Sequence, residues 1–146
     1  MPILGSIGAM SAKGFGLFAA LTKVFTGLLT ALSPATIATG TGPYVVTISN
    51  DGTSVYVANL SSSTVSMYSR NTTTGQLTAL SPATIATGTS PYGVTISADG
   101  TSVYVINNGG NTVSMYSRNT TTGQLTALSP ATIATGVNPR GVTISA

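Results

Sequence analysis

The sequence contains very few charged residues and has no cysteine, histidine or glutamate. The charged residues number five basic and two acidic among 146, namely Lys13, Lys23, Arg70, Arg118, Arg140, Asp51 and Asp99. A typical globular chain is about a quarter charged, so this surface must consist mainly of Thr, Ser, Asn and Gly. Because no run of Lys or Arg forms the basic patch that nucleic-acid binding requires, we expect no nucleic-acid partner.

The missing residue types also narrow the chemistry. Without cysteine there are no disulfides or thiolate metal sites, and without histidine or glutamate only Asp51 and Asp99 remain as candidate general bases or metal ligands. Both aspartates precede glycine at equivalent positions, where closing a hairpin turn accounts for them. The sequence therefore predicts no catalytic residue, no metal ligand and no cofactor, and a protein that is not an enzyme.

The N-terminal part lacks a long uninterrupted apolar run. Lys13 and Lys23 bound the apolar stretch 14–22, which is shorter than the roughly 20 residues that cross a bilayer. The basic residues do not precede an apolar core as they do in a secretory signal. We therefore expect neither a cleavable signal nor a membrane span. Low charge with abundant Thr and Ser is common in extracellular β proteins, and this favours an extracellular location.

A fixed repeat organises the rest of the chain. The 25 residues 64–88, "TVSMYSRNTTTGQLTALSPATIATG", recur letter for letter at 112–136, and a partial copy, "LTALSPATIATGT", stands at 29–41. Successive Ser-Pro pairs begin at Ser33, Ser81 and Ser129, a spacing of 48 residues each time. The two full copies differ at nine of 48 positions. Such a period indicates a repeat architecture.

One repeat divides at its turn residues into four extended runs, approximately 93–97, 102–107, 112–118 and 124–136. Apolar and polar residues alternate in the first three, as in half-buried strands, and Asp99-Gly100 indicates a hairpin turn. The alternation predicts that Val94, Ile96, Val103, Val105, Val113 and Met115, with their equivalents one period earlier, face a shared core. A unit of this length with four antiparallel strands is typical of one blade of a β-propeller.

The strand and turn motifs also carry a family resemblance. "DGTSVYVAN" at 51–59 and "DGTSVYVIN" at 99–107, followed by "TVSMYS" and "TTGQLT", resemble the Tyr-Val-Thr-Asn blade repeat and the related lactonase-type propellers. The resemblance begins near Thr26 and implies an all-β fold of tandem four-stranded antiparallel blades. Together with the count of strands, it predicts an incomplete ring that follows a short N-terminal segment outside the repeat.

The expected organisation is an N-terminal apolar and Gly-rich segment (1–27), a lone fourth strand (28–42), two blades (43–90 and 91–138) and the first strand of a further blade (139–146). Two blades cannot close a ring, since propellers have about four to eight. Three accounts stay open: a ring or filament of several chains built by strand exchange, a stacked solenoid-like array, or a chain cut from a longer propeller. Assembly between copies is favoured, and it predicts subunit contacts at the two ends, through Leu29, Leu32, Val142 and Ile144.

Tyrosines recur one period apart, and Arg140 replaces the tyrosine of the first pair in the third copy. Aromatic side chains in register suit stacking on sugars, although packing between blades explains them equally well. Tyr44, Tyr92 and Arg140 are therefore candidate contacts for surface glycans or another partner.

Three functions follow from this pattern. Near-identical blades present one surface repeatedly, which favours a non-catalytic structural protein that assembles into an extracellular filament, tail fibre or virion. The composition of Gly5 to Gly16 loosely resembles the leading segments of bacteriophage structural and tail-associated proteins, and it points the same way. A multivalent glycan-binding or adhesion module is the alternative, and a lactonase-like enzyme fragment is the third.

Overall fold

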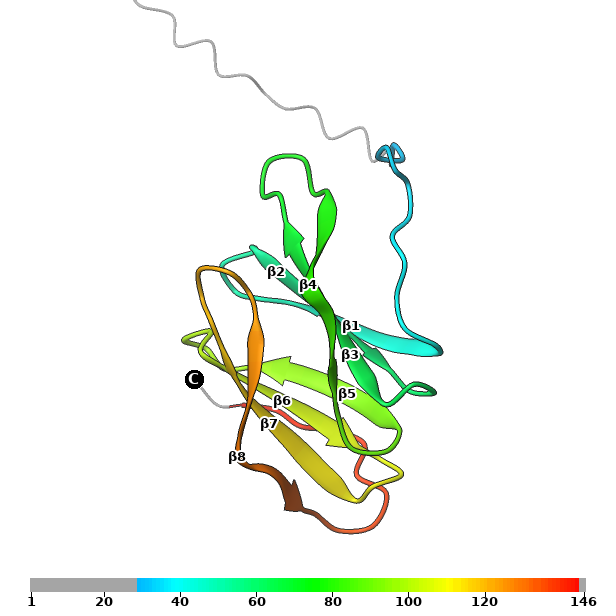
Figure 1. Ribbon diagram of the computed structural model, residues 1–146, viewed down its shortest axis with the longest axis vertical. Helices are drawn as coiled ribbons and strands as arrows, with labels where there is room; N and C mark the ends of the chain where they lie inside the picture. The colour runs from blue at the N-terminus through cyan, green and yellow to red at the C-terminus, as the bar shows by residue number, and fades with distance from the viewer. Residues whose placement is uncertain (1–28, 145–146) are drawn as a thin grey trace, which may run out of the picture. The chain divides into compact units, whose positions relative to one another are not determined.

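The computed structural model describes residues 29–144, and this part of the chain folds into two four-stranded antiparallel sheets (Figure 1). The first sheet has the order β1-β2-β3-β4 and the second β5-β6-β7-β8. The strands are β1 (Pro43–Ile48), β2 (Ser54–Asn59), β3 (Thr64–Arg70), β4 (Leu77–Ala86), β5 (Pro91–Ile96), β6 (Ser102–Asn107), β7 (Thr112–Arg118) and β8 (Leu125–Ala134). The predicted all-β fold of tandem blades is confirmed. We call the two sheets blade 1 and blade 2.

The turns have the geometry that their residues predict. Gly52 and Gly100 follow the two aspartates with φ of 70° and 72°, a region that glycine enters without steric cost. The Asp51 carboxylate accepts a hydrogen bond from the backbone amide of Thr53 at 2.9 Å, and Asp99 accepts one from Thr101 at 3.0 Å. Each aspartate thus closes the first hairpin of its blade, as the sequence predicts.

The register of the second hairpin corrects the predicted core. Asn107 pairs with Thr112, so odd-numbered residues of β6 lie beside even-numbered residues of β7, and Tyr104 pairs with Met115. Directly paired residues point to the same face of a sheet. The prediction that Val113 and Met115 share a face with Val103 was therefore wrong: they lie on the opposite face. Both faces of a blade are apolar because a propeller covers each with a neighbouring blade.

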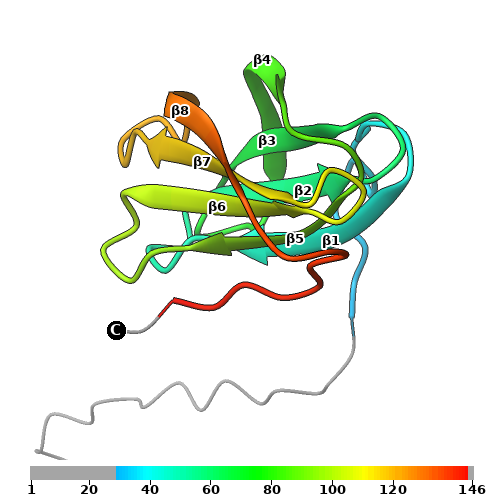
Figure 2. The same cartoon turned by 90° about the horizontal axis from the view of Figure 1, so that it is seen from below.

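The two sheets pack face to face around one core. It contains Tyr56, Val65 and Met67 of blade 1, all 0% exposed, and Val103, Val105, Tyr116 and Leu125 of blade 2. The first strands β1 and β5 run side by side, as Figure 2 shows from below. Blade 1 thus packs with the face that carries the even-numbered residues of β2 and the odd-numbered residues of β3. Blade 2 packs with the other face, which carries the odd-numbered residues of β6 and the even-numbered residues of β7. This is the stacking of consecutive propeller blades.

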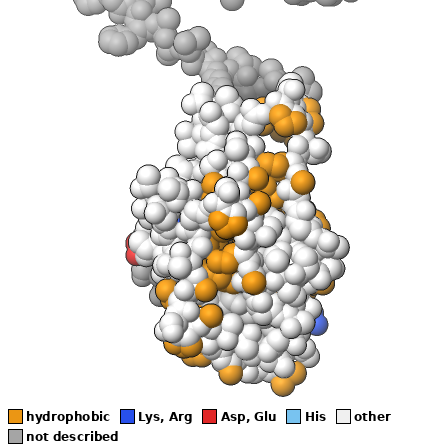
Figure 3. Space-filling view, in the orientation of Figure 1, with side chains coloured by type: hydrophobic (Ala, Val, Ile, Leu, Met, Phe, Trp, Pro, Cys, Tyr) orange, Lys and Arg blue, Asp and Glu red, His pale blue; other side chains and the backbone are white. Residues whose placement is uncertain are grey.

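The flanking segments have irregular structure. Residues 29–42 and 139–144, expected as a lone fourth strand and a first strand, carry no strand assignment. Residues 1–27 lie outside the described residues. Both blades belong to one compact unit that begins at Ala31. Across residues 29–144 no helix is long and apolar enough to cross a bilayer. The face seen in Figure 3 is mostly uncharged, with apolar side chains gathered along its middle.

Candidate functional site

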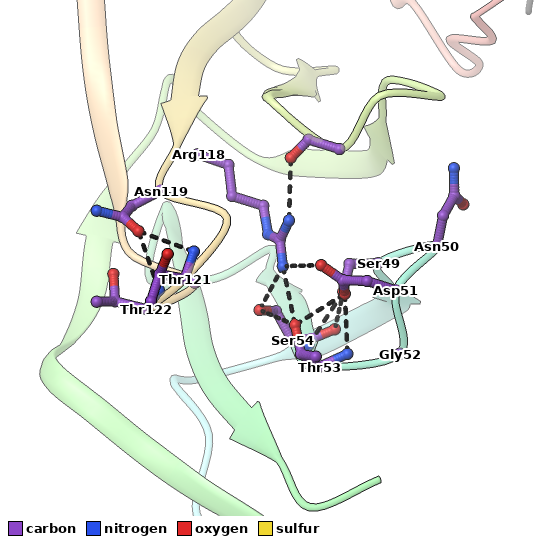
Figure 4. A network of polar contacts seen from close by, with 12 residues as sticks. Ser49, Asn50, Asp51, Gly52, Thr53, Ser54, Arg118, Asn119, Thr121 and Thr122 are labelled. Carbon is purple, nitrogen blue, oxygen red and sulfur yellow. Dashed lines mark hydrogen bonds and ion pairs between the residues drawn. The ribbon is translucent and has the colours of Figure 1, made fainter.

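A network of polar contacts joins the two blades at Arg118, the last residue of β7 (Figure 4). The Arg118 side chain is fully buried, and its Nη2 lies 3.0 Å from Asp51 Oδ2. Nη2 also donates to Thr53 Oγ1 at 3.1 Å and to Ser54 Oγ at 2.9 Å, and Nε donates to the Tyr56 hydroxyl at 3.0 Å. All four acceptors belong to blade 1. One guanidinium of blade 2 therefore binds the first turn and second strand of the preceding blade.

Arg118 is also held by its own blade. Its Nη1 donates to the Gly100 carbonyl at 3.0 Å, and the Tyr56 hydroxyl donates to the Gly123 carbonyl at 2.6 Å. Each nitrogen of the guanidinium thus donates a hydrogen bond, as a buried arginine requires. The phenol of Tyr56 is a link in the same chain, and burial raises its pKa. The arrangement holds the blades together.

The carboxylate of Asp51 is tied into this network. Burial raises its pKa, but hydrogen bonds from Ser49, Thr53 and Arg118 outweigh that effect and hold the pKa well below the usual range. A carboxylate that is so stabilised takes up protons poorly. Asp51 is therefore a structural partner of Arg118, in addition to closing its turn.

Sequence reasoning missed Arg118 because nothing local distinguishes it. Arg70 stands in the same letters, "TVSMYSRNTTTG", one period earlier. Only the position of the second copy after a complete blade separates the two arginines. One feature of the sequence could have identified Arg118. An arginine and an Asp-Gly turn each recur once per period, in a chain with few other charged residues.

The structure brings two of the predicted contact residues together. The hydroxyl of Tyr44 in β1 donates to that of Tyr92 in β5 at 2.6 Å, and the ring centroids lie 4.4 Å apart. This hydrogen bond raises the pKa of Tyr44, and the charge of the nearby Arg140 acts in the opposite direction. Tyr44 is 54% exposed and Arg140 is exposed. Tyr44 and Tyr92 are thus in contact, and the exposed Arg140, one period further on, is near enough for its charge to act on Tyr44. We call these three residues the cluster.

The four predicted subunit contacts have different surroundings. Leu29 is 96% exposed and Leu32 is 45% exposed, and Leu32 lines a cavity with Gly75 and Leu77. Val142 and Ile144 are half-buried. Whether these side chains meet another copy stays a prediction.

Other groups that could support chemistry are sparse in the described chain. Hydrogen bonds from Ser97 and then from Thr101 lower the pKa of the exposed Asp99 to about 2. Within residues 29–144, no three His, Cys, Asp or Glu side chains lie close enough to hold a metal ion. The Tyr44, Tyr92 and Arg140 cluster is therefore the accessible group of polar side chains that we treat as the candidate site.

A family model described as lactonase, seven-bladed β-propeller, matches residues 29–140. The chain belongs to this lactonase family. The predicted resemblance to lactonase-type propellers is confirmed, and the match begins after the segment that suggested a bacteriophage protein. A comparison with curated proteins found no match.

Solved structures support the same fold. A periplasmic gluconolactonase from Pseudomonas aeruginosa has a TM-score of 0.62 and 22% identity, over 75% of this chain and 30% of that one. A proposed 6-phosphogluconolactonase from Bacteroides fragilis has a TM-score of 0.59 and 24% identity, over 66% and 26%. A protein from Lactobacillus plantarum has a TM-score of 0.60 and 25% identity, over 72% and 30%. The chain thus spans between 26% and 30% of the length of these three structures.

These findings overturn the predicted function. The lactonase family match contradicts both a non-catalytic filament, fibre or virion component and the expectation that the protein is not an enzyme. It favours the lactonase-like interpretation, which ranked third. The prediction failed because it weighed the catalytic groups of two blades as if they were the whole of a propeller, whose site draws on several blades.

Proposed function

We propose that this chain supplies part of a lactonase-type propeller that hydrolyses a lactone of a sugar acid. The observation that carries the proposal is the lactonase family match over residues 29–140. The gluconolactonase and 6-phosphogluconolactonase names of structural neighbours suggest the substrate class. Two blades are a minority of a seven-bladed ring, so the residues of this chain contribute to the site together with those of other blades.

We assign lactone binding to the cluster of Tyr44, Tyr92 and Arg140. Tyr44 donates its hydroxyl proton to Tyr92, which leaves the Tyr92 hydroxyl proton for a substrate oxygen. Arg140 is exposed and close enough to affect the pKa of Tyr44. Tyr44 lies on β1 and Tyr92 on β5, and these two strands of the two blades lie side by side (Figure 2). First strands of neighbouring blades line the centre of a propeller, where ligands bind.

The reaction adds one water molecule to the lactone. The water oxygen bonds to the carbonyl carbon, the bond between that carbon and the ring oxygen breaks, and a proton from the water ends on the ring oxygen. The product is a hydroxy acid, which releases its carboxyl proton near neutral pH. The Tyr92 hydroxyl and the Arg140 guanidinium stabilise the negative charge that develops on the carbonyl oxygen as the water adds.

Neither aspartate acts as the base in this scheme. Asp51 is engaged by Arg118 and its pKa is held low, and Asp99, with a pKa of about 2, is a weak proton acceptor. Because Asp51 and Asp99 are the only acidic side chains of the chain, a solvent water takes the proton of the attacking water. The contribution of this chain is to bind and polarise the lactone.

The test is proton release from δ-gluconolactone and from 6-phosphogluconolactone, followed with a pH indicator over a range of chain concentrations. We expect hydrolysis faster than the spontaneous rate, with a loss of about tenfold in Tyr92→Phe and more in Arg140→Gln. Tyr104→Phe is the matched control, since it removes a phenol outside the cluster, and its rate should equal that of the parent at chain concentrations where light scattering shows the same assembly as the parent.

Binding is measured separately by the change in tyrosine fluorescence with gluconate, the reaction product. Spontaneous rates at every concentration, together with no fluorescence change on adding gluconate, would contradict the proposal. Hydrolysis that is insensitive to Arg140→Gln would overturn the assignment of the site.

A further inference from the structure

The contact between the two blades is a template for a second contact, because the repeats are nearly identical. Blade 2 offers a socket formed by Arg118 and Gly123, and blade 1 fills it with Asp51, Ser54 and Tyr56. A Cβ atom placed on Gly123 would lie 2.5 Å from Ser54 Oγ, so the fit leaves no spare room.

Blade 1 has an equivalent socket, formed by Arg70 and Gly75, but in the described residues no second blade fills it. Arg70 Nη1 donates to the Gly52 carbonyl at 3.1 Å, as Arg118 does to Gly100. Among the described residues, Arg70 has no carboxylate partner. A Cβ atom on Gly75, the counterpart of Gly123, would come no closer than 3.9 Å to any neighbour. A cavity of about 230 Å³ lies there, lined by Gly75, Leu77 and residues of the segment 31–40 that include Leu32 and Ile37.

The apolar side chains on this face also differ in burial between the two blades. Val46 and Ile48 are 60% and 54% exposed, whereas their counterparts Val94 and Ile96 pack against the core. This face of blade 1 therefore has the residues of a blade contact without the neighbouring blade.

The residues that would fill this socket lie on blade 2, on the face that does not contact blade 1. Asp99, Ser102, Tyr104 and Met115 correspond to Asp51, Ser54, Tyr56 and Met67. Tyr56 and Met67 are 0% exposed, whereas Tyr104 and Met115 are only half-buried and Asp99 is exposed. The two open faces thus match in shape by repetition, and their charges are opposite.

One segment, residues 31–40, already covers part of the surface of blade 1 on which another blade would dock. The Tyr68 hydroxyl donates to the Ala38 carbonyl at 2.6 Å, just as Tyr116 donates to Ala86 at 2.6 Å. Residues 31–40 therefore already occupy the place, on blade 1, of the fourth strand of a preceding blade. That segment, "ALSPATIATG", has the same letters as 127–136 of β8 and the turn after it.

We propose that blade 2 of a second copy of this chain docks on blade 1, with its Asp99 bound to Arg70 of the first copy. Residues 31–40 of the first copy then pair with β7 of the second, in place of the second copy's own β8. Because the two segments are identical, the exchange replaces each side chain by the same side chain. Ile37 takes the position of Ile133, opposite Val113.

The contact is head to tail, so it repeats from copy to copy and closes when the rotation permits. Two blades from each copy and about four to eight blades in a propeller give a ring of about two to four copies, and its even number of blades differs from the seven of the family model. The inference concerns assembly alone, and a ring that hydrolyses no lactone would leave it intact.

Charge reversal tests the ion pair, with light scattering and sedimentation as measurements. The parent should form a discrete particle as its concentration rises. Arg70→Glu and Asp99→Arg, each alone, should raise the concentration needed for assembly at least tenfold, while circular dichroism keeps the β signal of the parent. The Arg70→Glu chain mixed with the Asp99→Arg chain should assemble again, because each mixed contact then has one acid and one base.

Cross-linking tests the exchanged strand, in a chain that has no cysteine of its own. A chain with Ile37→Cys mixed with a chain carrying Val113→Cys should form a disulfide-linked dimer under mild oxidation. Replacing Val113→Cys by Thr120→Cys, on an exposed turn, gives the matched control and should not cross-link. A parent that stays monomeric, or single reversals that assemble normally, would overturn the docking. Restored assembly without the Ile37 to Val113 cross-link would overturn the strand exchange.

Discussion

Arg118 and Asp51 form an ion pair of 3.0 Å across the boundary between two blades that have nearly the same sequence. The Arg118 side chain is fully buried and the Asp51 side chain is 41% exposed. A buried arginine is tolerated only when its donors are satisfied, and here the acceptors come from both blades. The ion pair therefore fixes the position of one blade relative to the next. The sequence contains few other charged side chains that could do this.

Arg118→Gln should destabilise the chain strongly. The substitution leaves the buried groups of Ser54, Tyr56 and Gly100 without their donor and removes the partner of Asp51. Breaking a buried pair costs about 3–5 kcal/mol, and we expect about 3 kcal/mol because Asp51 keeps contact with water. Urea unfolding measures this change. Arg140→Gln is the control with the same change of charge on an exposed residue, and it should stay within about 0.5 kcal/mol of the parent.

Tyr56→Phe removes one hydroxyl that accepts from Arg118 and donates to Gly123. Leaving buried partners unpaired costs about 1–3 kcal/mol. Tyr104→Phe is the same substitution one period later, where the described residues offer the hydroxyl no hydrogen bond, and it should change stability by less than about 0.5 kcal/mol. Equal losses in the two variants, measured by thermal or urea unfolding of dilute chain, would contradict a role for the inter-blade network.

Met67→Ala and Met115→Ala compare one apolar position on the covered and uncovered faces. Met67 is 0% exposed, so truncation should cost about 2–5 kcal/mol. Met115 is half-buried, and its truncation should cost less than half as much in dilute chain. If a second copy covers blade 2, the Met115→Ala variant should also assemble less readily. A loss at Met115 that equals the loss at Met67 without assembly would show that the two faces are covered alike.

Stability should fall at acidic pH because of the two aspartates, the only acidic side chains in the sequence. The pKa of Asp51 is lowered on folding, and that of Asp99 is lowered to about 2. Both contribute stability that is complete above about pH 5, the region where the carboxyls of the unfolded chain have lost their protons. That contribution is lost as the pH falls through the folded-state pKa values.

Urea midpoints should therefore be level from about pH 7 to pH 5 and decline below about pH 4. The Asp51→Asn variant should be less stable at neutral pH and show a shallower decline. Asp99→Asn serves as the comparison, since its carboxylate has turn contacts but no buried arginine. A decline in Asp51→Asn as steep as that of the parent would mean that other groups control the acid response.

Much of the fold could be predicted from the sequence, because strands and turns depend on local patterns. The alternation in "SVYVIN" and the Asp99-Gly100 turn predicted β6 and the hairpin before it, and the 48-residue spacing predicted two equivalent blades. The glycines that needed positive φ stood where the turns required them. These features involve neighbours within a few residues, so identical letters produced identical structure in both copies.

The tertiary structure decided what the letters could not distinguish. Met67 and Met115 have the same local sequence, yet only Met67 is fully buried, and Arg70 and Arg118 differ in the same way. Burial depends on whether another blade lies against the face, and that is a property of position in the stack. The face of Val113 depended on the register across a turn, and the meeting of Tyr44 with Tyr92 depended on two first strands lying side by side. The repeated sequence thus determined the fold of each blade. The contact between the blades determined which of two identical residues is buried and which partners it has.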